Sequence, residues 1–294
     1  MIMVGDAGWK KYRWVFIFLA PSLIGLILFT LGPILASLGL TLFQWDLISA
    51  PQFVGLDNFR EVFANSDFWQ SLQHTLYFVV GYIPLVMICA LGVALLLNQR
   101  LRGLALYRTA FFIPVVSSWV VISLLGKWVF NPRFGLVNYG LSLLGIAGPN
   151  WLFSPQWAMP AIIFTSVWKD IGFVMVMYLA GLQGIPADFR EASALDGASA
   201  RQHFRFITLP LLSPTTFFAL VISLIASFQV FDQVWIMSET GNKQATTVLV
   251  QQIVQNAFSY GRMGTATAMS WVLFVFIFVI TLFQLRLQRQ WVNY

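Results

Sequence analysis

Residues 75–98 read TLYFVVGYIPLVMICALGVALLLN and contain no charged side chain. A helix needs about 20 predominantly apolar residues to cross the hydrocarbon core of a bilayer. Because that core holds no water, each backbone N–H and C=O must find its partner within the protein, which restricts spanning segments to helices and closed barrels. One long uninterrupted apolar run favours a helix, so this stretch predicts a membrane-spanning helix.

Five further apolar runs surround it, at residues 15–43, 109–130, 156–182, 211–235 and 265–285. The whole chain is 59% hydrophobic and only 10% charged, with a mean hydropathy of +0.77, whereas soluble proteins carry about 25% charged residues. We therefore expect an all-α, polytopic membrane helix bundle of about six transmembrane helices, forming one domain over residues 1–294. A cleavable signal peptide would have a much shorter apolar region than the first run, about 7–15 residues, so a retained span is favoured.

The basic residues predict the orientation of these spans. A net charge of +6 could indicate nucleic-acid binding, but the basic residues form four clusters that all lie on one predicted side: Lys10, Lys11 and Arg13; Arg100, Arg102 and Arg108; Arg190, Arg201 and Arg205; Arg286 and Arg289. The opposite loops have fewer basic residues, and acidic residues offset them: Arg60, Arg133, Lys243 and Arg262 against Asp46, Asp57, Glu61, Asp67 and Glu239. Cytoplasmic loops are enriched in Lys and Arg. The pattern predicts that both termini are cytoplasmic, and it favours membrane lipid over nucleic acid as the partner of the basic residues.

The largest loop on that side, residues 183–210, contains the sequence GIPADFREASALDGASARQHFRFITLP. Pro186 suits the start of a helix and Asp188 suits its first turn. Gly197 suits its end, because glycine readily adopts the left-handed conformation found there. A second short helix can follow over about residues 199–206, before Pro210 marks the next span. The loop therefore predicts a cytoplasmic helix-turn-helix.

Spacing within this loop matches the EAA signature: Glu-Ala-Ala, three residues, Gly, nine residues, Ile-x-Leu-Pro. The matching residues are Glu191, Ala192, Gly197, Ile207, Leu209 and Pro210, with Ser193 in place of the third alanine. The chain thus resembles the permease (transmembrane) subunits of binding-protein-dependent ABC importers. Further short motifs extend the resemblance over nearly the whole chain and narrow it to the sugar, polyol and glycerol-phosphate branch: Ala20-Pro21-Ser22, Gly32-Pro33, Trp45-Asp46, Phe53-Val54-Gly55-Leu56-Asp57-Asn58-Phe59, Asn98, Arg108, Tyr178-Leu179-Ala180-Gly181-Leu182-Gln183 and Ile185-Pro186.

The resemblance implies a multi-pass protein of the bacterial or archaeal cytoplasmic (inner) membrane. Its implied partners are a second homologous permease subunit, two ATPase subunits and an external or periplasmic solute-binding protein that supplies a sugar, polyol, glycoside or glycerol-phosphate solute. Residues 183–210, the coupling loop, would dock into a cleft of an ATPase subunit. In this hypothesis Glu191 and Arg201 offer polar contacts, Ala192, Ala194 and Leu195 pack in the cleft, and Gly197 permits the turn. The remaining residues expected to couple to the ATPase are Ser193, Ile207, Leu209 and Pro210.

Nothing in the sequence indicates catalysis by this chain. It has no Gly-x-x-x-x-Gly-Lys-Ser/Thr phosphate loop, so ATP and Mg are expected on the partner ATPase subunits. The motifs of the common metalloproteases and serine hydrolases are also missing from the sequence. Cys89 is the single cysteine, and His74 and His203 fall on opposite predicted sides of the membrane. We therefore expect no catalytic residue, no cofactor and no metal in this chain.

Two groups of polar residues within the spans are candidates for the solute pathway. Lys169 and Asp170 lie near the middle of the fourth run, where charge is expensive and usually faces a cavity or a partner. As neighbours they point about 100° apart on a helix, so a direct ion pair between them is disfavoured. Structural contacts between helices remain the alternative for both.

The second candidate group is Gln229, Asp232 and Gln233, which would share one face of a helix because of their spacing. Phe228 lies beside them, and aromatic stacking with hydrogen bonding suits a sugar. An interfacial position remains the alternative for Asp232.

The sequence departs from the related permeases after the fifth run. Where they commonly carry Thr-x-Gly-Gly-Pro, this chain reads Ser238-Glu239-Thr240-Gly241-Asn242-Lys243, so the geometry of that turn is open. A membrane enzyme acting on a lipid-linked sugar, and a stand-alone channel or secondary carrier, are the rival hypotheses. Neither explains the signature in the loop.

Overall fold

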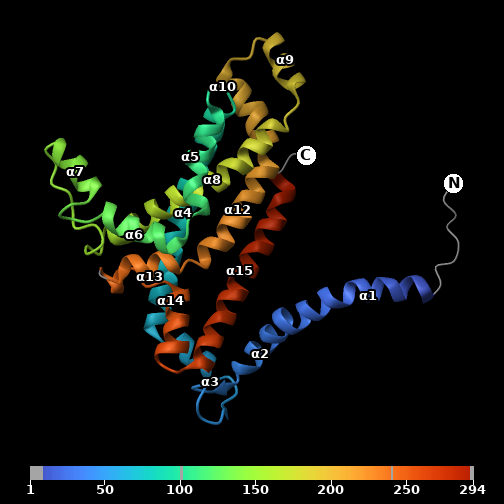
Figure 1. Ribbon diagram of the computed structural model, residues 1–294, viewed down its shortest axis with the longest axis vertical. Coiled ribbons are helices and arrows are strands. Elements are labelled where there is room, and N and C mark those ends of the chain that lie inside the picture. The colour runs from blue at the N-terminus through green and yellow to red at the C-terminus, as the bar shows by residue number, and fades with distance from the viewer. Residues whose placement is uncertain (1–8, 100–101, 240, 292–294) are drawn as a thin grey trace. The chain divides into compact units, whose positions relative to one another are not determined.

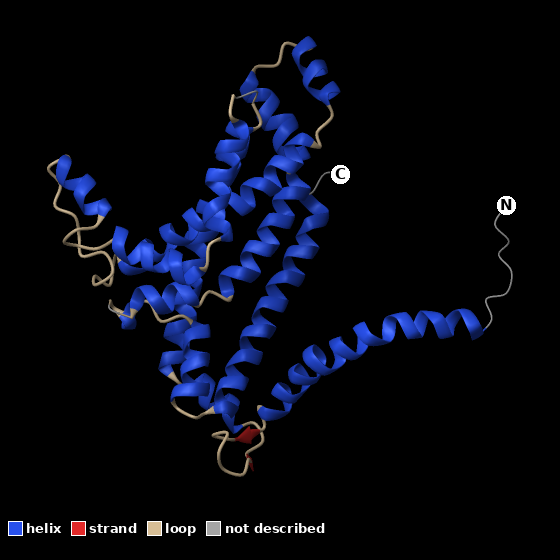
Figure 2. Cartoon of the chain, in the orientation of Figure 1, coloured by secondary structure: helices blue, strands red, loops and turns tan. Residues whose placement is uncertain are grey.

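Helices dominate the computed structural model, which describes residues 9–99, 102–239 and 241–291 (Figures 1 and 2). Arg100 and both extreme termini, whose cytoplasmic position the sequence predicts, lie outside the described residues. Contacts divide the chain into two units, residues 1–65 with 253–272 and residues 66–252 with 273–294. A single membrane domain over residues 1–294 stays a prediction.

The first unit begins with a long apolar helical segment made of α1 (Trp9–Leu26), the π-helix η1 (Ile27–Leu31) and α2 (Gly32–Leu40). Pro33 has no N–H to donate to the preceding turn, and the Gly32 N–H bonds instead to the Ile27 carbonyl, five residues back. The most apolar stretch of this segment has no buried residue in the structure. Such a surface suits a lipid environment.

A short hairpin and three helical segments complete the first unit. Strands β1 (Phe43–Gln44) and β2 (Gln52–Phe53) pair antiparallel, followed by α3 (Asp57–Ala64), the π-helix η4 (Gln255–Ser259) and the start of α15 (Met263–Trp291). The buried Asn58 amide donates to the carbonyls of Thr41 (2.8 Å) and Phe43 (3.0 Å). Gly264 of α15 lies against the same two groups, Asn58 and the Phe43 carbonyl. This part of the 53–59 motif therefore has a structural role.

The second unit contains the helix bundle. Its elements are α4 (Ser66–Leu97), α5 (Leu104–Val116), α6 (Trp119–Val129), α7 (Leu136–Leu143), α8 (Ala158–Gln183), α9 (Ala187–Leu195), α10 (Ala200–His203), the π-helix η2 (Phe204–Thr208), α11 (Leu209–Leu211), α12 (Ser213–Phe228), α13 (Asp232–Ser238), the 3₁₀-helix η3 (Lys243–Ala245), α14 (Leu249–Val254, whose last residues belong to the first unit) and residues 273–291 of α15.

Helix α4 packs into this bundle through one apolar face. Phe78, Tyr82, Val86, Ala90 and Ala94 recur at four-residue spacing and are all buried, which is the pattern of a helix packed along one side. That helix packs against α8 and α12, and α5 also packs against α8.

A close approach of helices α5 and α8 depends on Gly172. A β-carbon at Gly172 would collide with the backbone carbonyl of Phe111 in α5. Small residues allow such close packing between membrane helices.

Among the described residues, four helices are long and apolar enough to cross a membrane, Arg13–Leu40, Ser66–Leu97, Ala158–Gln183 and Met263–Gln288. Two bent pairs raise the number to six if each pair counts as one span: α5 with α6, bent by 101°, and residues 200–211 with α12, bent by 61°. The bend between α5 and α6 follows Pro114, and Ser118 then accepts from the Val120 N–H to start α6. The predicted all-α membrane helix bundle is confirmed, with four to six candidate spans among the described residues.

The continuous helix predicted over residues 211–235 is wrong. Helix α12 ends at Phe228, and α13 begins at Asp232 after an irregular segment of three residues. An unpaired backbone is tolerated at membrane depth where it lines a cavity. Hydropathy alone does not reveal this interruption, because a hydropathy window averages Gln229 and Asp232 with the apolar residues around them.

Candidate functional site

Helix α9 in the 183–210 loop ends in a hydrogen-bonded turn around Gly197. The Gly197 N–H donates to the Ala194 carbonyl (3.1 Å), and the Ala198 N–H donates to the Ser193 carbonyl (2.9 Å). Gly197 has a φ of 74°, the left-handed conformation that this type of helix end requires. The predicted role of Gly197 in ending the first short helix is therefore confirmed.

The second half of the loop starts with a reciprocal cap. Ser199 accepts from the Gln202 N–H, and the Gln202 side chain accepts from the Ser199 N–H at 2.8 Å. Helix α10 then passes through η2 into α11, which carries Pro210 near its start. The predicted second helix is confirmed, although a π-turn interrupts it.

Ser193 links the two halves of the loop. Its hydroxyl donates to the Arg190 carbonyl (2.9 Å) and lies 2.8 Å from Nδ1 of His203. Ser193 is only 7% exposed. The residue that replaces the third alanine of the signature thus contacts the loop itself, whereas the sequence placed it on the docking surface.

Other signature residues are open to a partner. Glu191, Ala192, Ala194 and Arg201 are exposed, and the Leu195 side chain is 89% exposed. Together these residues leave one face of the loop accessible to a partner. Ile207 and Pro210 are half-buried, and Leu209 is 42% exposed.

A cavity of about 350 Å³ lies in the helix bundle at the interruption between α12 and α13. It brings together residues of six helices and the 229–231 segment. Its lining is Phe78, Tyr82, Val115, Trp119, Asp170, Phe173, Val174, Ile222, Ser223, Ala226, Ser227, Gln229, Val230, Phe231, Asp232 and Gln233. Apolar walls with a few convergent polar groups are typical of small-molecule sites.

The structure brings four predicted pathway residues together at this cavity: Asp170, Gln229, Asp232 and Gln233. Gln229 and Asp232 are exposed, whereas Gln233 is 6% exposed and its amide donates to Ser166 at 3.4 Å. The spacing of Gln229, Asp232 and Gln233 suggested that they share one face of a helix. In the structure the interrupted backbone between α12 and α13 brings them together. Phe228 does not line the cavity; it is buried and packs edge-on against Phe276 at 5.5 Å.

Asp170 and Lys169 have different partners, as their helical spacing predicts. The Tyr82 hydroxyl donates to the Asp170 carboxylate (2.8 Å). Lys169 is 6% exposed, its ammonium donates to the Val115 carbonyl (3.1 Å), and it lies 4.6 Å from the Trp119 ring centroid. Lys169 is therefore held at the bend between α5 and α6 and is not part of the cavity lining.

Sequence reasoning missed Tyr82 and Trp119 as members of the cavity lining. Tyr82 lies in the apolar stripe of α4, and Trp119 follows the bend after Pro114. Nothing in the sequence separates either residue from ordinary packing, because each depends on how α8 lies against its neighbours.

The segment that departs from the usual Gly-Gly-Pro turn is anchored to the bundle. The Gly241 N–H donates to the Ser238 carbonyl (3.0 Å), and the Asn242 N–H donates to the Leu152 carbonyl (2.9 Å). The Asn242 side chain accepts from the Ala245 N–H at the start of η3. Thr240 of this segment lies outside the described residues.

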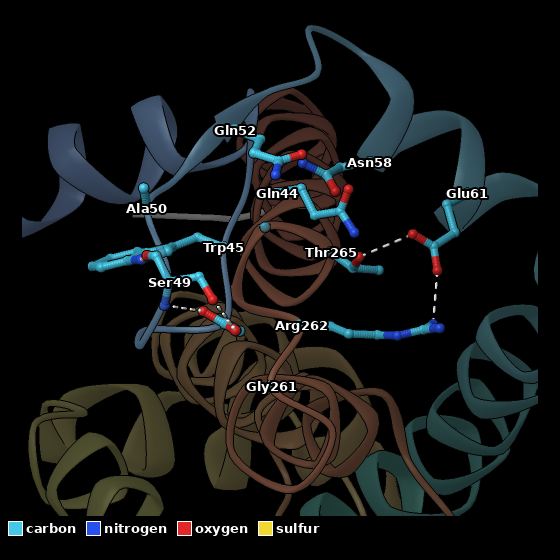
Figure 3. A pocket seen from close by; sticks show the side chains of 12 residues that line it. Gln44, Trp45, Ser49, Ala50, Gln52, Asn58, Glu61, Gly261, Arg262 and Thr265 are labelled. Carbon is cyan, nitrogen blue, oxygen red and sulfur yellow. Dashed lines mark hydrogen bonds and ion pairs between the residues drawn. The ribbon is translucent and has the colours of Figure 1, made fainter.

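A polar pocket of about 230 Å³ lies beside the hairpin of the first unit (Figure 3). Glu61 accepts from Arg262 (2.8 Å) and from Thr265 (3.1 Å), joining α3 to the start of α15. Asp46 accepts from the backbone N–H of Ser49 and then of Ile48, and these bonds hold the pKa of its carboxyl below the usual value. The charged groups of this pocket thus have partners within the unit.

No group of three or more metal-binding side chains occurs among the described residues. This geometry leaves two surfaces for function. One is the exposed face of the 183–210 loop, and the other is the cavity at the α12–α13 interruption.

Residues 83–292 match the family model described as the inner membrane component of binding-protein-dependent transport systems. The chain is 38% identical over 282 residues to the probable ABC transporter permease protein YesP of Bacillus subtilis, covering 94% of this chain and 91% of YesP. It is 34% identical over 284 residues to the trehalose/maltose transport system permease protein MalF of Thermococcus litoralis, covering 95% and 96%.

Solved structures show the same fold. A chain in the crystal structure of a bacterial alginate ABC transporter, in complex with an alginate pentasaccharide-bound periplasmic protein, superimposes with a TM-score of 0.85 at 25% identity. The match covers 97% of this chain and 98% of that one.

Proposed function

The chain belongs to the family of inner membrane components of binding-protein-dependent transport systems, and on this premise we propose that it is the permease subunit of an ATP-driven sugar importer. Its relatives include permeases for trehalose and maltose and for lactose, and its fold is that of an alginate transporter chain. The chain is thus a sugar ABC transporter permease. The observation that carries this conclusion is the match over nearly the whole length.

The 183–210 loop is the part of this proposal that concerns ATP. With no phosphate loop of its own, the chain must receive the energy of ATP hydrolysis from other subunits. The exposed face around Glu191, Ala192 and Leu195 supplies a contact surface, while Ser193 and Gly197 fix the shape of the loop. A rigid loop can transmit a movement of the ATPase subunits to the helices that carry it.

The cavity at the α12–α13 interruption is the proposed solute pathway. Tyr82, Trp119 and Phe231 offer aromatic surface, and Asp170, Gln229 and Asp232 offer hydrogen-bonding groups. This combination suits a hydroxylated solute. A second permease subunit would complete the pathway, and an external binding protein would deliver the solute.

The proposed location is the cytoplasmic membrane, with both termini and the 183–210 loop in the cytoplasm. The distribution of basic residues supports this orientation. It puts the loop on the side where ATP is available.

A cross-linking experiment tests the proposed docking surface. With the only cysteine removed (Cys89→Ser), Leu195→Cys should cross-link to a co-expressed ATPase subunit of the same importer. Leu144→Cys is the matched control, because Leu144 is also highly exposed (75%) but lies on the opposite predicted side. Equal cross-linking of the two variants, or none at Leu195, would reject the surface.

The pathway is tested separately with Asp232→Asn and Lys169→Met in the reconstituted importer. Asp232→Asn should reduce solute uptake because Asp232 is an exposed group of the cavity. Lys169→Met should act mainly on folding, since Lys169 bonds to the α5 backbone. If uptake and solute-stimulated ATP hydrolysis are unchanged in Asp232→Asn, this residue does not contact the solute.

A further inference from the structure

Helices α5 and α8 enclose a groove of about 440 Å³ that the transport mechanism does not use. Its lining consists of Arg108, Thr109, Phe112, Ile113, Val116 and Val176. The five α5 residues are spaced alternately one and three positions apart along the chain, so they lie along one face of that helix. The groove therefore runs along the axis of α5, with its only charged side chain at one end.

The apolar part of the groove is open to the surroundings of the protein. Ile113 is 57% exposed, Val116 is 72% exposed and Val176 is 44% exposed. From Arg108 to Val116 the helix rises by about 12 Å, at about 1.5 Å per residue. This length accommodates a substantial part of a lipid acyl chain.

Arg108 carries a positive charge that the described residues do not neutralise. None of the ion pairs among them includes Arg108, and its Nε atom is buried without a hydrogen-bond partner. A buried donor without a partner destabilises the protein. An anionic group with several acceptor oxygens at this end of the groove would remove that destabilisation.

Arg108 also lies near the end of α5 that the sequence predicts to face the cytoplasm. It is one turn inside the start of α5, next to the loop that carries Arg102. Basic pockets between membrane helices on the cytoplasmic side bind anionic lipid head groups. Long basic side chains near helix ends reach toward the interface in the same way.

We propose that this groove is a binding site for an acidic phospholipid, with the phosphate at Arg108 and an acyl chain along Phe112, Ile113 and Val116. The site goes beyond solute transport and depends on the proposed function only for its cytoplasmic side. Thr109 adds a hydroxyl at the head-group end. A lipid bound there bridges α5 and α8, the two helices whose contact Gly172 permits.

The test measures lipid retention by the assembled importer, with its second permease and ATPase subunits. The complex is purified from nanodiscs of phosphatidylglycerol and phosphatidylcholine, and native mass spectrometry identifies the lipids that remain bound. Phosphatidylglycerol should be retained in preference to phosphatidylcholine. Arg108→Gln should reduce this preference about fivefold, because one basic residue near the membrane surface contributes about 1 kcal/mol.

Three further variants distinguish binding in the groove from attraction of the lipid to general surface charge. Arg102→Gln removes a charge from the same end of the protein but does not line the groove, so it should keep the preference. Arg108→Lys should retain most of it, and Ile113→Trp should lower retention by filling the groove while leaving the charge in place. The lysine and tryptophan variants also guard against a glutamine variant that fails to fold.

Equal losses in Arg108→Gln and Arg102→Gln would overturn the proposal in favour of general surface charge. Equal retention of phosphatidylglycerol and phosphatidylcholine would also overturn the proposal. A cross-link from Val116→Cys to the second permease subunit would overturn it too, because it would show a protein partner in the groove. Because retention is measured without transport, failure of the lipid site and failure of the importer function give different results.

Discussion

Replacing Gly197 by alanine should uncouple the importer. Gly197 has a φ of 74°, and a left-handed conformation costs an alanine about 1–2 kcal/mol more than a glycine. An alanine β-carbon would meet no atom within 4 Å, so the whole cost comes from the backbone. At about 1.4 kcal/mol per factor of ten, the native turn would become roughly five- to thirtyfold less favoured against competing loop conformations.

The assay is the ratio of solute imported to ATP hydrolysed in proteoliposomes that contain the full importer. Gly197→Ala should lower this ratio, because the surface around Leu195 would no longer be held in one position. Gly197→Asn is the matched control: asparagine tolerates the left-handed conformation, so it should retain most of the coupling. If the alanine and asparagine variants lose the same amount, side-chain volume matters at Gly197, and a conformational role for this glycine is refuted.

Three further predictions concern stability. Gly172→Ala should lower the stability of the purified protein by the roughly 1–3 kcal/mol typical of overpacking, because the new β-carbon would meet the α5 backbone. The control Gly92→Ala has open space around the new β-carbon and should not lower it. Equal melting temperatures for the two variants would contradict the close approach of α5 and α8. Tyr82→Phe should cost about 1–3 kcal/mol by leaving Asp170 without its donor, and unchanged unfolding in denaturant would mean that water replaces the hydroxyl. The turn that holds Asp46 lowers the pKa of its carboxyl, so Asp46 stabilises this turn fully above its unfolded pKa of about 3.9 and loses the effect as the pH falls through the lower folded value. Amide exchange in the turn, corrected for intrinsic rates, should therefore be insensitive to pH between about 5 and 8. Exchange should be faster in Asp46→Asn at each pH.

Sequence reasoning succeeded where the information is local. The apolar run 75–98 is part of α4, and Gly197 takes the left-handed conformation that the loop pattern requires. Divergence of Lys169 and Asp170 also follows from helical geometry alone.

Sequence reasoning failed where contacts between different segments of the chain decide the outcome. The interruption after Phe228 lies among a few polar residues in a run that is apolar on average, so hydropathy predicts a continuous helix through it. Ser193 looks like a neutral substitution for alanine until the fold brings His203 within 2.8 Å. Tyr82 enters the cavity only because α4 packs on α8.

ATP-dependent uptake by proteoliposomes tests the importer function most directly. The proteoliposomes would contain this chain and its partner permease, with or without the two ATPase subunits, and receive radiolabelled solute on its cognate binding protein. We predict accumulation of solute only when the ATPase subunits and ATP are both present. Accumulation at the same rate without the ATPase subunits would contradict the proposed function.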